Sequence, residues 1–262
     1  MEDKPNPQAG MSEEMHDGGI LVITLTRPES LNPFGIAERE AWNELLHSIE
    51  SQAKACRAVV FTGSGRAFSA GGDVKQFGEM FSHGADKAFL HMQRFQEMSR
   101  LVWRLPVPVI AAINGLALGG GTAIALMSDL RVASDQSKFS VGQIKRGFVP
   151  DVGMTYLLPR IVGLGRAMEM MLLSEPIDAQ TALAYGLVNR VVAPDQVLPT
   201  AMAIARQLAE LPEGGVRWIK RTTYLNMDAS FEQALNTEAM AEAVLAGGPD
   251  FMRALTAFMN KK

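Results

Sequence analysis

The sequence predicts an α/β fold with a parallel sheet, followed by a helical C-terminal region. Up to about residue 142, short apolar segments of strand length alternate with longer segments whose apolar residues recur at helical spacing. Beyond that point helical segments dominate. The chain has 262 residues, of which 47% are apolar and 20% charged, so it can bury one large core and is not disordered throughout.

The first half of the chain alternates between predicted strands and helices. Residues 20–26 form an apolar run of strand length, and Trp42, Leu45, Leu46 and Ile49 recur at helical spacing within 34–55. Further strands are predicted at 58–62, 107–113 and 130–133, and further helices at 87–104 and from the glycines at 119–121 to Met127. Strands that alternate with helices pair in parallel through right-handed crossovers, which gives the predicted sheet.

The second half is predicted to be mainly helical. Helices are expected at 154–162, 166–173, 179–185, 196–211, 214–225, 231–246 and 249–259, with one short strand at 187–192. Their apolar faces are too numerous for one monomer to bury, so we expect a subunit interface. The chain is therefore divided into a tail at 1–17, a core at 18–195 and a helical assembly region at 196–262.

Two segments could be mistaken for targeting signals. Residues 1–17 carry five acidic residues, one lysine and no apolar run, so we expect a disordered tail and not a secretory signal. The 24 residues 105–128 are uncharged, but two prolines and four glycines divide them. We interpret them as a buried strand, a turn and a buried helix, and not as a membrane span.

Charge and cysteine content exclude further classes of protein. The formal net charge is −3, so the chain lacks the basic excess of a nucleic-acid-binding protein. The single cysteine, Cys56, rules out an intrachain disulfide and fits a reducing, cytoplasmic environment. The four histidines lack metal-ligand spacing, so we expect no metal site.

Two glycine-rich loops follow predicted strands. The first is Arg66-Ala-Phe-Ser-Ala-Gly-Gly-Asp73, and the second, Ala117-Leu-Gly-Gly-Gly-Thr122, opens a helix. Backbone N–H groups at a helix start bind an anion, or an oxygen that becomes anionic during a reaction. Taken singly, each loop is also compatible with a tight strand-to-helix turn. Neither is a phosphate-binding loop of the Gly-x-Gly-x-x-Gly or Gly-Lys-Ser/Thr type.

In this order, the loops and their flanking segments resemble the crotonase superfamily, the enoyl-CoA hydratase/isomerase family. The resemblance covers nearly the whole chain after the acidic tail. Further segments that carry it are Arg27-Pro-Glu-Ser-Leu-Asn32, Phe61-Thr-Gly63, Pro108-Val-Ile-Ala-Ala-Ile-Asn-Gly-Leu-Ala-Leu-Gly-Gly-Gly121, Leu157-Leu-Pro-Arg-Ile-Val-Gly163 and Ala182-Leu-Ala-Tyr-Gly-Leu-Val188. The resemblance implies a crotonase-like spiral of strand–strand–helix turns with a C-terminal helical region that mediates homotrimers or homohexamers. It also implies an acyl-CoA thioester substrate and no further cofactor.

Carried over motif by motif, the resemblance places the two oxyanion-binding N–H groups on Gly72 and Gly120. Glycine suits both positions because it lets a thioester approach the backbone closely. The same loop implies substrate-binding positions at Phe68, Ser69, Ala70 and Asp73, with the backbone of the first three lining the adenine pocket. Lys75 either reaches a CoA phosphate or is a solvated surface lysine.

The sequence departs from the hydratases of this family at both catalytic glutamates. The positions are occupied by Ala123 and Gln143. Addition of water needs one group to take a proton and another to give one, which alanine cannot do. Gln143 can hydrogen-bond substrate or water but cannot titrate, so it is assigned to substrate binding. Efficient hydration is therefore not expected.

One carboxylate remains at a matching position, in Phe148-Val-Pro-Asp-Val-Gly153. From local pattern alone, Asp151 is the N-cap of the helix that follows. Aspartate-bearing isomerases of the superfamily, which act on dienoyl-CoA or on ring epoxides of phenylacetate degradation, carry a catalytic aspartate here. A chlorobenzoyl-CoA dehalogenase uses an aspartate here as nucleophile, but that enzyme has a tryptophan at the position of Gln143.

The sequence therefore favours enoyl-CoA double-bond isomerisation, with Asp151 as the proton shuttle and an enolate held by the glycine N–H groups. Burial among apolar neighbours is expected to raise the pKa of Asp151 toward the working pH. The alternatives are a hydratase-type lyase, another enolate reaction on an aromatic or alicyclic CoA ester, and a non-catalytic trimer that binds CoA esters.

Overall fold

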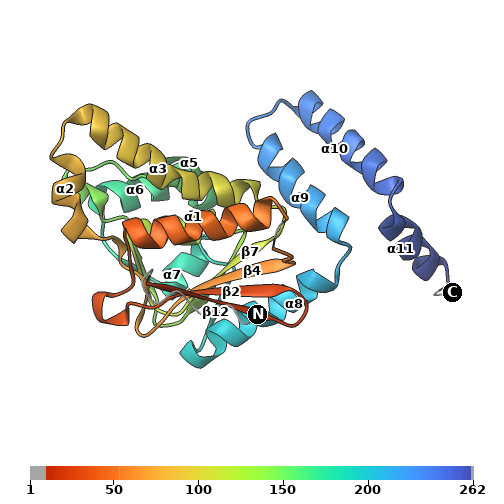
Figure 1. Ribbon diagram of the computed structural model, residues 1–262, viewed down its shortest axis with the longest axis horizontal. Helices are drawn as coiled ribbons and strands as arrows, with labels where there is room; N and C mark the ends of the chain where they lie inside the picture. Colours follow the sequence, from red (N-terminus) through yellow and green to blue (C-terminus); the bar gives the residue numbers. More distant parts are fainter. Residues whose placement is uncertain (1–9, 53, 261–262) are drawn as a thin grey trace.

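The computed structural model describes residues 10–52 and 54–260 and contains one six-stranded sheet at its centre (Figure 1). Its strands, in sheet order, are β1 (Met11–His16), β2 (Ile20–Leu25), β4 (Ala58–Gly63), β7 (Val109–Ile113), β9 (Leu130–Ser134) and β12 (Arg190–Val192). β1 pairs antiparallel with β2, and every other neighbouring pair is parallel. The predicted parallel sheet is confirmed.

Short strands that follow the strands of this sheet in the sequence form two smaller sheets. β5 (Ala67–Ser69), β8 (Leu116–Leu118), β10 (Lys138–Ser140) and β11 (Ile177–Asp178) form one, and β3 (Pro33–Phe34) pairs with β6 (Gly71–Gly72) in the other. Helices follow these strands: α1 (Ile36–Glu50), α2 (Phe77–Phe81), α3 (Ala85–Arg104), α4 (Gly120–Met127) and α5 (Met154–Val162). The chain thus repeats strand, strand and helix, which is the expected crotonase-like spiral.

Helices cover both faces of the six-stranded sheet. Alternate strand residues such as Ile23 and Phe61 pack with α1 and α3, while Val22 and Val60 pack with α8 (Val197–Glu210). Figure 1 shows α1 and α3 on one side of the sheet and α8 on the other. Burial on both faces explains why the strands appear in the sequence as continuous apolar runs. It also places α8 with the core, whereas the sequence predicts it as part of the assembly region.

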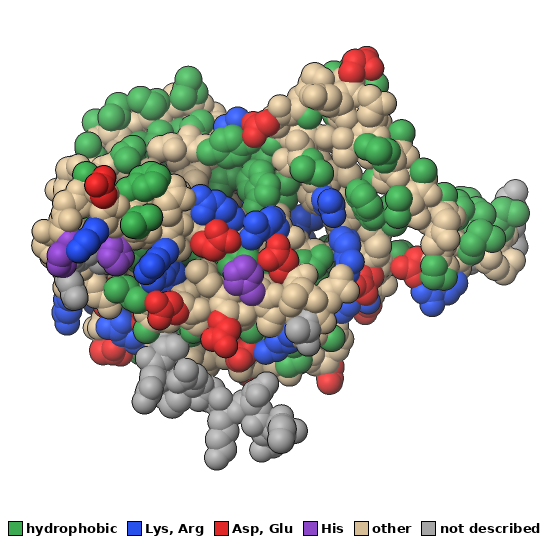
Figure 2. Space-filling view, turned by 45° about the horizontal axis from the view of Figure 1, so that its top comes forward, with side chains coloured by type: hydrophobic (Ala, Val, Ile, Leu, Met, Phe, Trp, Pro, Cys, Tyr) green, Lys and Arg blue, Asp and Glu red, His purple; other side chains and the backbone are tan. Residues whose placement is uncertain are grey.

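The last three helices differ in how closely they contact the sheet. α9 (Glu213–Asn226) is anchored to the sheet, because the buried Lys220 Nζ lies 2.8 Å from Asp129 Oδ2 and donates to the carbonyl of Val107. α10 (Phe231–Ala246) packs against α9, and α11 (Pro249–Met259) packs against α10. Both project from the sheet as an arm, along which Figure 2 shows hydrophobic side chains. The arm includes Phe231 and Phe258, which are 75% and 77% exposed.

Two expectations for the ends and loops need correction. The predicted tail at 1–17 includes β1, whose Met11 is buried and whose backbone pairs with β2 along its whole length. An edge strand pairs with only one neighbour and buries only one face, so β1 can form from a polar sequence that gives no apolar run. Residues 1–9 lie outside the described residues. The first glycine loop also contains two strands, β5 and β6, which are too short to give a periodic pattern.

The remaining helices are α6 (Leu164–Leu173) and α7 (Ala179–Ala184), close to their predicted bounds. The uncharged segment 105–128 folds as β7 and α4, as predicted, and as the short strand β8 between them, which the sequence does not predict. None of the helices in the described part of the chain combines the length and apolar character needed to cross a membrane.

Candidate active site

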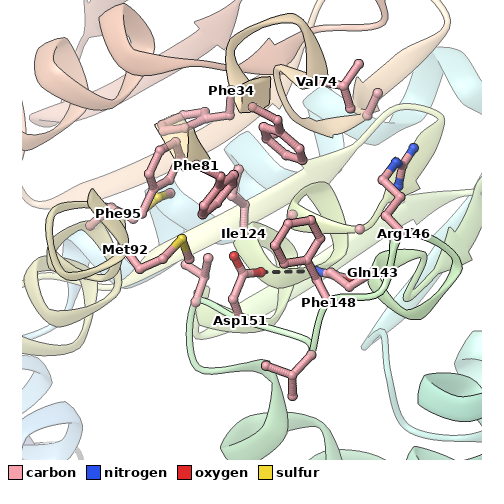
Figure 3. A pocket seen from close by; sticks show the side chains of 18 residues that line it. Phe34, Val74, Phe81, Met92, Phe95, Ile124, Gln143, Arg146, Phe148 and Asp151 are labelled. Atoms are coloured by element: carbon pink, nitrogen blue, oxygen red, sulfur yellow. Dashed lines mark hydrogen bonds between the residues drawn. The ribbon is translucent and has the colours of Figure 1, made fainter. Parts of the chain in front are cut away.

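A cavity of about 230 Å³ lies where the glycine loops meet α2, α3 and the segment 143–152 (Figure 3). Its wall is largely apolar and includes five phenylalanines, which are Phe34, Phe77, Phe81, Phe95 and Phe148. Phe77, Phe81 and Phe148 contact one another, with ring centroids 5.1 to 6.2 Å apart, and so join α2 to the segment 143–152. The polar and charged side chains of the wall are Gln143, Arg146 and Asp151.

The two glycines predicted to bind an oxyanion lie side by side in this wall. Gly72 and Gly120 both line the cavity, and a methyl group on Gly120 would lie 3.3 Å from the backbone nitrogen of Gly72. A methyl group on the preceding Gly71 would lie only 2.5 Å from the nitrogen of Gly120. Glycine is thus required because two backbone segments pass each other closely. As the first residue of α4, Gly120 has an N–H with no acceptor inside the helix, at the positive end of the helix dipole.

Among the described residues, Asp151 provides the only carboxylate in the cavity wall. Its Oδ1 accepts a 3.1 Å hydrogen bond from Gln143 Nε2, drawn as a dashed line in Figure 3. Burial raises the pKa of the Asp151 carboxyl above its ordinary value, and the bond from Gln143 offsets part of that rise. The group is therefore better suited to hold a proton near neutral pH than an exposed aspartate.

The structure does not support the capping interpretation of Asp151. Helix α5 begins at Met154 with Gly153 as its N-cap, and no side chain caps it. The backbone carbonyl of Asp151 accepts from the Met154 N–H, while its side chain bonds to Gln143. Val152, the residue between Asp151 and the N-cap Gly153, has a φ of +55°, which is unusual for a β-branched residue. This turn directs the carboxylate into the cavity wall and away from the helix.

The two positions that carry glutamate in the hydratases present different chemistry here. Ala123 is fully buried in α4 and does not contribute to the cavity wall. Gln143 does line the cavity, with its Nε2 bound to Asp151 and its Oε1 buried and without a hydrogen-bond partner among the described residues. Of these three positions, only Asp151 therefore carries an acid–base group in the described part of the cavity wall.

The remaining predicted residues of the first loop occupy different environments. Ala70 lines the cavity, whereas the side chains of Phe68 and Ser69 are fully buried in the core. Both carboxylate oxygens of Asp73 are engaged, since Oδ1 accepts from the Lys75 N–H and Oδ2 lies 3.3 Å from Arg27 Nη1. The Lys75 side chain is exposed. The loop therefore brings Ala70 and Gly72 to the cavity and turns the Asp73 side chain away from it.

Most of the apolar cavity wall and one of its charged side chains have no clear signal in the sequence. Phe77 and Phe81 come from α2, a helix of five residues that is too short to give a helical period. Arg146 lines the cavity on the side away from Phe95 and Met92 (Figure 3). Its only sequence signal is its position three residues after Gln143. No group of three or more His, Cys, Asp or Glu side chains among the described residues is placed to hold a metal ion.

Comparison with known proteins identifies the family. The model of the enoyl-CoA hydratase/isomerase family matches residues 15–262. The chain is 37% identical over 244 residues to a probable enoyl-CoA hydratase of Mycobacterium tuberculosis, covering 91% of this chain and 83% of that protein. It is 32% identical over 245 residues to the 1,2-epoxyphenylacetyl-CoA isomerase of Escherichia coli, covering 93% of each.

Among solved structures, the enoyl-CoA hydratase of Bacillus anthracis superimposes with a TM-score of 0.89 at 31% identity, covering 97% of each chain. Fold, paired glycines and sequence relatives agree, and the chain belongs to the enoyl-CoA hydratase/isomerase family of the crotonase superfamily, whose enzymes act on CoA esters.

Proposed function

We propose that this enzyme moves the double bond of an enoyl-CoA thioester, with Asp151 as the proton shuttle. The observation that carries the proposal is that the described residues of the cavity wall include a single carboxylate, Asp151, together with Gly72 and Gly120. Isomerisation needs one group that takes a proton and returns it elsewhere, whereas hydration needs two groups acting on water. The residues present match the first requirement.

In the proposed reaction the thioester oxygen accepts hydrogen bonds from the N–H groups of Gly72 and Gly120. The ionised Asp151 removes a proton from the carbon chain, and the electrons move to the thioester oxygen to give a dienolate. The glycine N–H groups stabilise this charge, and Asp151 returns the proton to a different carbon. Gln143 orients the carboxylate through its 3.1 Å hydrogen bond. The reaction uses no cofactor besides the CoA carried by the substrate.

Hydration is the second candidate, because the relatives named above include a hydratase as well as an isomerase. The replacement of the glutamates by Ala123 and Gln143 opposes it. Two missing acid–base groups, each worth about 10² to 10⁴ in rate, should leave hydration of crotonyl-CoA slow. A CoA-ester-binding protein without activity is the third candidate, and it gives no reason for a buried carboxylate in the cavity wall.

Incubation in heavy water separates these candidates. The purified protein is mixed with 2-enoyl-, 3-enoyl- and dienoyl-CoA esters, and mass spectrometry gives the product and the position of deuterium. Isomerisation yields a shifted double bond without the addition of a water molecule, and any deuterium that Asp151 has exchanged with the solvent lies on the carbon that receives the proton. A hydratase yields the hydroxyacyl-CoA, and a binding protein returns each ester unchanged. Turnover of crotonyl-CoA at hundreds per second would refute the proposal.

The variant Asp151→Asn tests the shuttle directly. Asparagine keeps the size of the side chain and its bond to Gln143 but cannot accept the proton. We expect isomerisation to fall by about 10³-fold or more, with the affinity for the CoA ester changed by less than about twofold, because the loss is confined to the transition state. Asp178→Asn is the matched control, since Asp178 caps α7 and lies outside the cavity wall. Full activity in Asp151→Asn would disprove the catalytic assignment.

A further inference from the structure

We propose that Arg27 is a positioning residue that fixes the oxyanion-binding N–H of Gly72 through an ionic clamp with Glu38 and Asp73. The inference rests on the proposed function, in which Gly72 supplies one of the two oxyanion donors. It gives a role to the segment Arg27-Pro-Glu-Ser-Leu-Asn32, which marks the family in the sequence but does not line the cavity.

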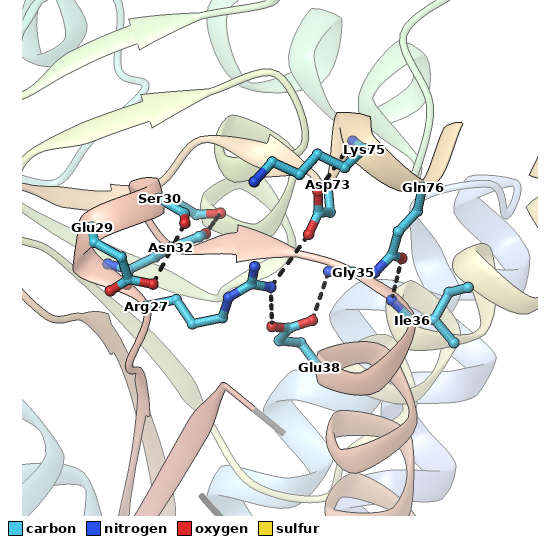
Figure 4. A network of polar contacts seen from close by, with 11 residues as sticks. Arg27, Glu29, Ser30, Asn32, Gly35, Ile36, Glu38, Asp73, Lys75 and Gln76 are labelled. Carbon is cyan, nitrogen blue, oxygen red and sulfur yellow. Dashed lines mark hydrogen bonds and ion pairs between the residues drawn. The ribbon is translucent and has the colours of Figure 1, made fainter. Parts of the chain in front are cut away.

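The clamp joins three segments that are distant in the sequence (Figure 4). Arg27 Nη1 lies 2.9 Å from Glu38 Oε1 in α1 and 3.3 Å from Asp73 Oδ2 in the glycine loop. The side chains of Glu38 and Asp73 are 3% and 10% exposed, while that of Arg27 is 32% exposed. Two carboxylates buried this close together need a shared cation, so Arg27 holds both in place.

Further hydrogen bonds tie the clamp to the backbone around Gly72. Glu38 Oε2 accepts from the Gly35 N–H at 2.9 Å, and Gln76 Oε1 accepts from the Ile36 N–H at 3.0 Å. The Gln76 N–H donates to the Asp73 carbonyl. The segment that begins with Asp73 is thus fastened to the start of α1 directly after Gly72.

The segment 27–32, which begins with Arg27, also holds the loop just before Gly72. The Ala70 N–H donates to the carbonyl of Leu31, and Ser69 Oγ donates to that of Asn32. Leu31 and Asn32 both have positive φ, at 62° and 52°, which is a strained conformation for leucine. A strained turn persists only where surrounding contacts define it, and here those contacts lead to the oxyanion loop.

Gly72 needs this support because glycine has no side chain that could anchor it. Its backbone is positioned by β3, where Phe34 pairs with it, and by its neighbours Gly71 and Asp73. An oxyanion donor acts only within a narrow range of distance to the developing charge, and a misplacement of about 1 Å can cost about 10²-fold in rate. The clamp therefore controls catalysis without touching the substrate.

The test uses acetoacetyl-CoA, a β-keto thioester whose enolate is recognised by its near-ultraviolet absorbance. Enolate formed in the site reports the oxyanion donors and does not require isomerisation. In Arg27→Met we expect the pH at which half of the bound ligand is enolate to rise by about one unit, a tenfold loss. The kcat for isomerisation should fall by about 10- to 100-fold. The affinity for butyryl-CoA, which tests ester binding alone, should change by less than about twofold.

Two further variants distinguish positioning from general stability. Arg27→Lys keeps one cation between the carboxylates and should recover most of the enolate and of kcat. Arg57→Met is the matched control, because Arg57 is 31% exposed and bonds to Glu213 and the Leu211 carbonyl away from the cavity wall. It should leave the enolate titration unchanged. If Arg27→Met does not fold, the same enolate titration is made with Asp73→Asn. This variant keeps the hydrogen bond from the Lys75 N–H and weakens the ion pair with Arg27.

Each result bears on a definite part of the proposal. Wild-type enolate titration in folded Arg27→Met, or in Asp73→Asn where Arg27→Met does not fold, would overturn the clamp and leave the proposed function intact. If the wild-type protein binds acetoacetyl-CoA but does not favour its enolate, the oxyanion assignment fails, and the clamp fails with it. An equal loss of enolate in Arg57→Met would show a stability effect and would also overturn the inference.

Discussion

At Asp151, stability and the proposed chemistry have opposite requirements. Burial raises the pKa of its carboxyl above the ordinary value, so the ionised form needed to remove a proton is the form that the fold disfavours. A carboxyl whose pKa is raised by folding binds its proton more tightly in the folded state. The folded protein therefore loses stability as the pH rises through that pKa.

The loss of stability with rising pH predicts a change in the stability of Asp151→Asn that is separate from its loss of activity. At pH 8 the variant should melt at the same temperature as the wild type or higher, because the cost of a buried charge is removed. The difference should shrink as the pH is lowered and the wild-type carboxyl becomes protonated. Calorimetry at several pH values measures it. A lower melting temperature at pH 8 would show that the charge stabilises the fold.

The bond from Gln143 predicts a second pH effect. Gln143 donates to Asp151 and thereby lowers its pKa, partly opposing burial. In Gln143→Leu the pKa of Asp151 should rise, and the acidic limb of the pH profile of kcat/KM should move to higher pH. Gln180→Leu, at an exposed position in α7, is the control and should leave the profile in place. An unchanged acidic limb in Gln143→Leu would show that another group titrates.

At the scale of elements, the start of α4 is packed too closely to accept any side chain. A methyl group on Gly121 would lie 2.0 Å from the carbonyl oxygen of Ser69 in β5, and the backbone of a strand cannot move aside cheaply. We expect Gly121→Ala to lower the free energy of unfolding by about 3 kcal/mol or more. Gly165→Ala in α6, where a methyl group meets no atom within 4 Å, should be neutral or mildly stabilising. Urea unfolding of both variants provides the comparison.

The elements also show how far the sequence alone predicts the fold. Long periodic segments such as α3 and α8 were predicted within a few residues, because one face of each gives a clear pattern. The short strands β5, β6 and β8 and the five-residue helix α2 were missed, because their formation depends on partners distant in the chain. The same limit applies to the site. Gly72, Gly120 and Asp151 were predicted from motifs. The phenylalanine wall and the ion pair of Asp73 with Arg27 could not be predicted, because they join residues that only the folded chain brings together.

At the scale of the molecule, the projecting arm of α10 and α11 predicts assembly. Phe251 and Phe258 of α11 are 45% and 77% exposed, which is costly for a monomer in water. We expect a homotrimer or homohexamer, with a mass near three or six times 28.4 kDa by light scattering. The double variant Phe251→Asp and Phe258→Asp should give smaller species, and Glu242→Gln on α10 should not. A stable wild-type monomer at micromolar concentration would contradict this prediction.

The order of strands in the main sheet has a consequence for synthesis of the chain. Sheet order β1, β2, β4, β7, β9 and β12 follows sequence order without exception, so each strand that leaves the ribosome can join the edge formed by the previous one. Helix α8, which contacts β2, β4, β7 and β9, arrives after all of them and covers their second face. Until then the nascent protein exposes one open parallel edge and one bare apolar face. Chains that terminate before α8 are therefore expected to aggregate and to depend on chaperones.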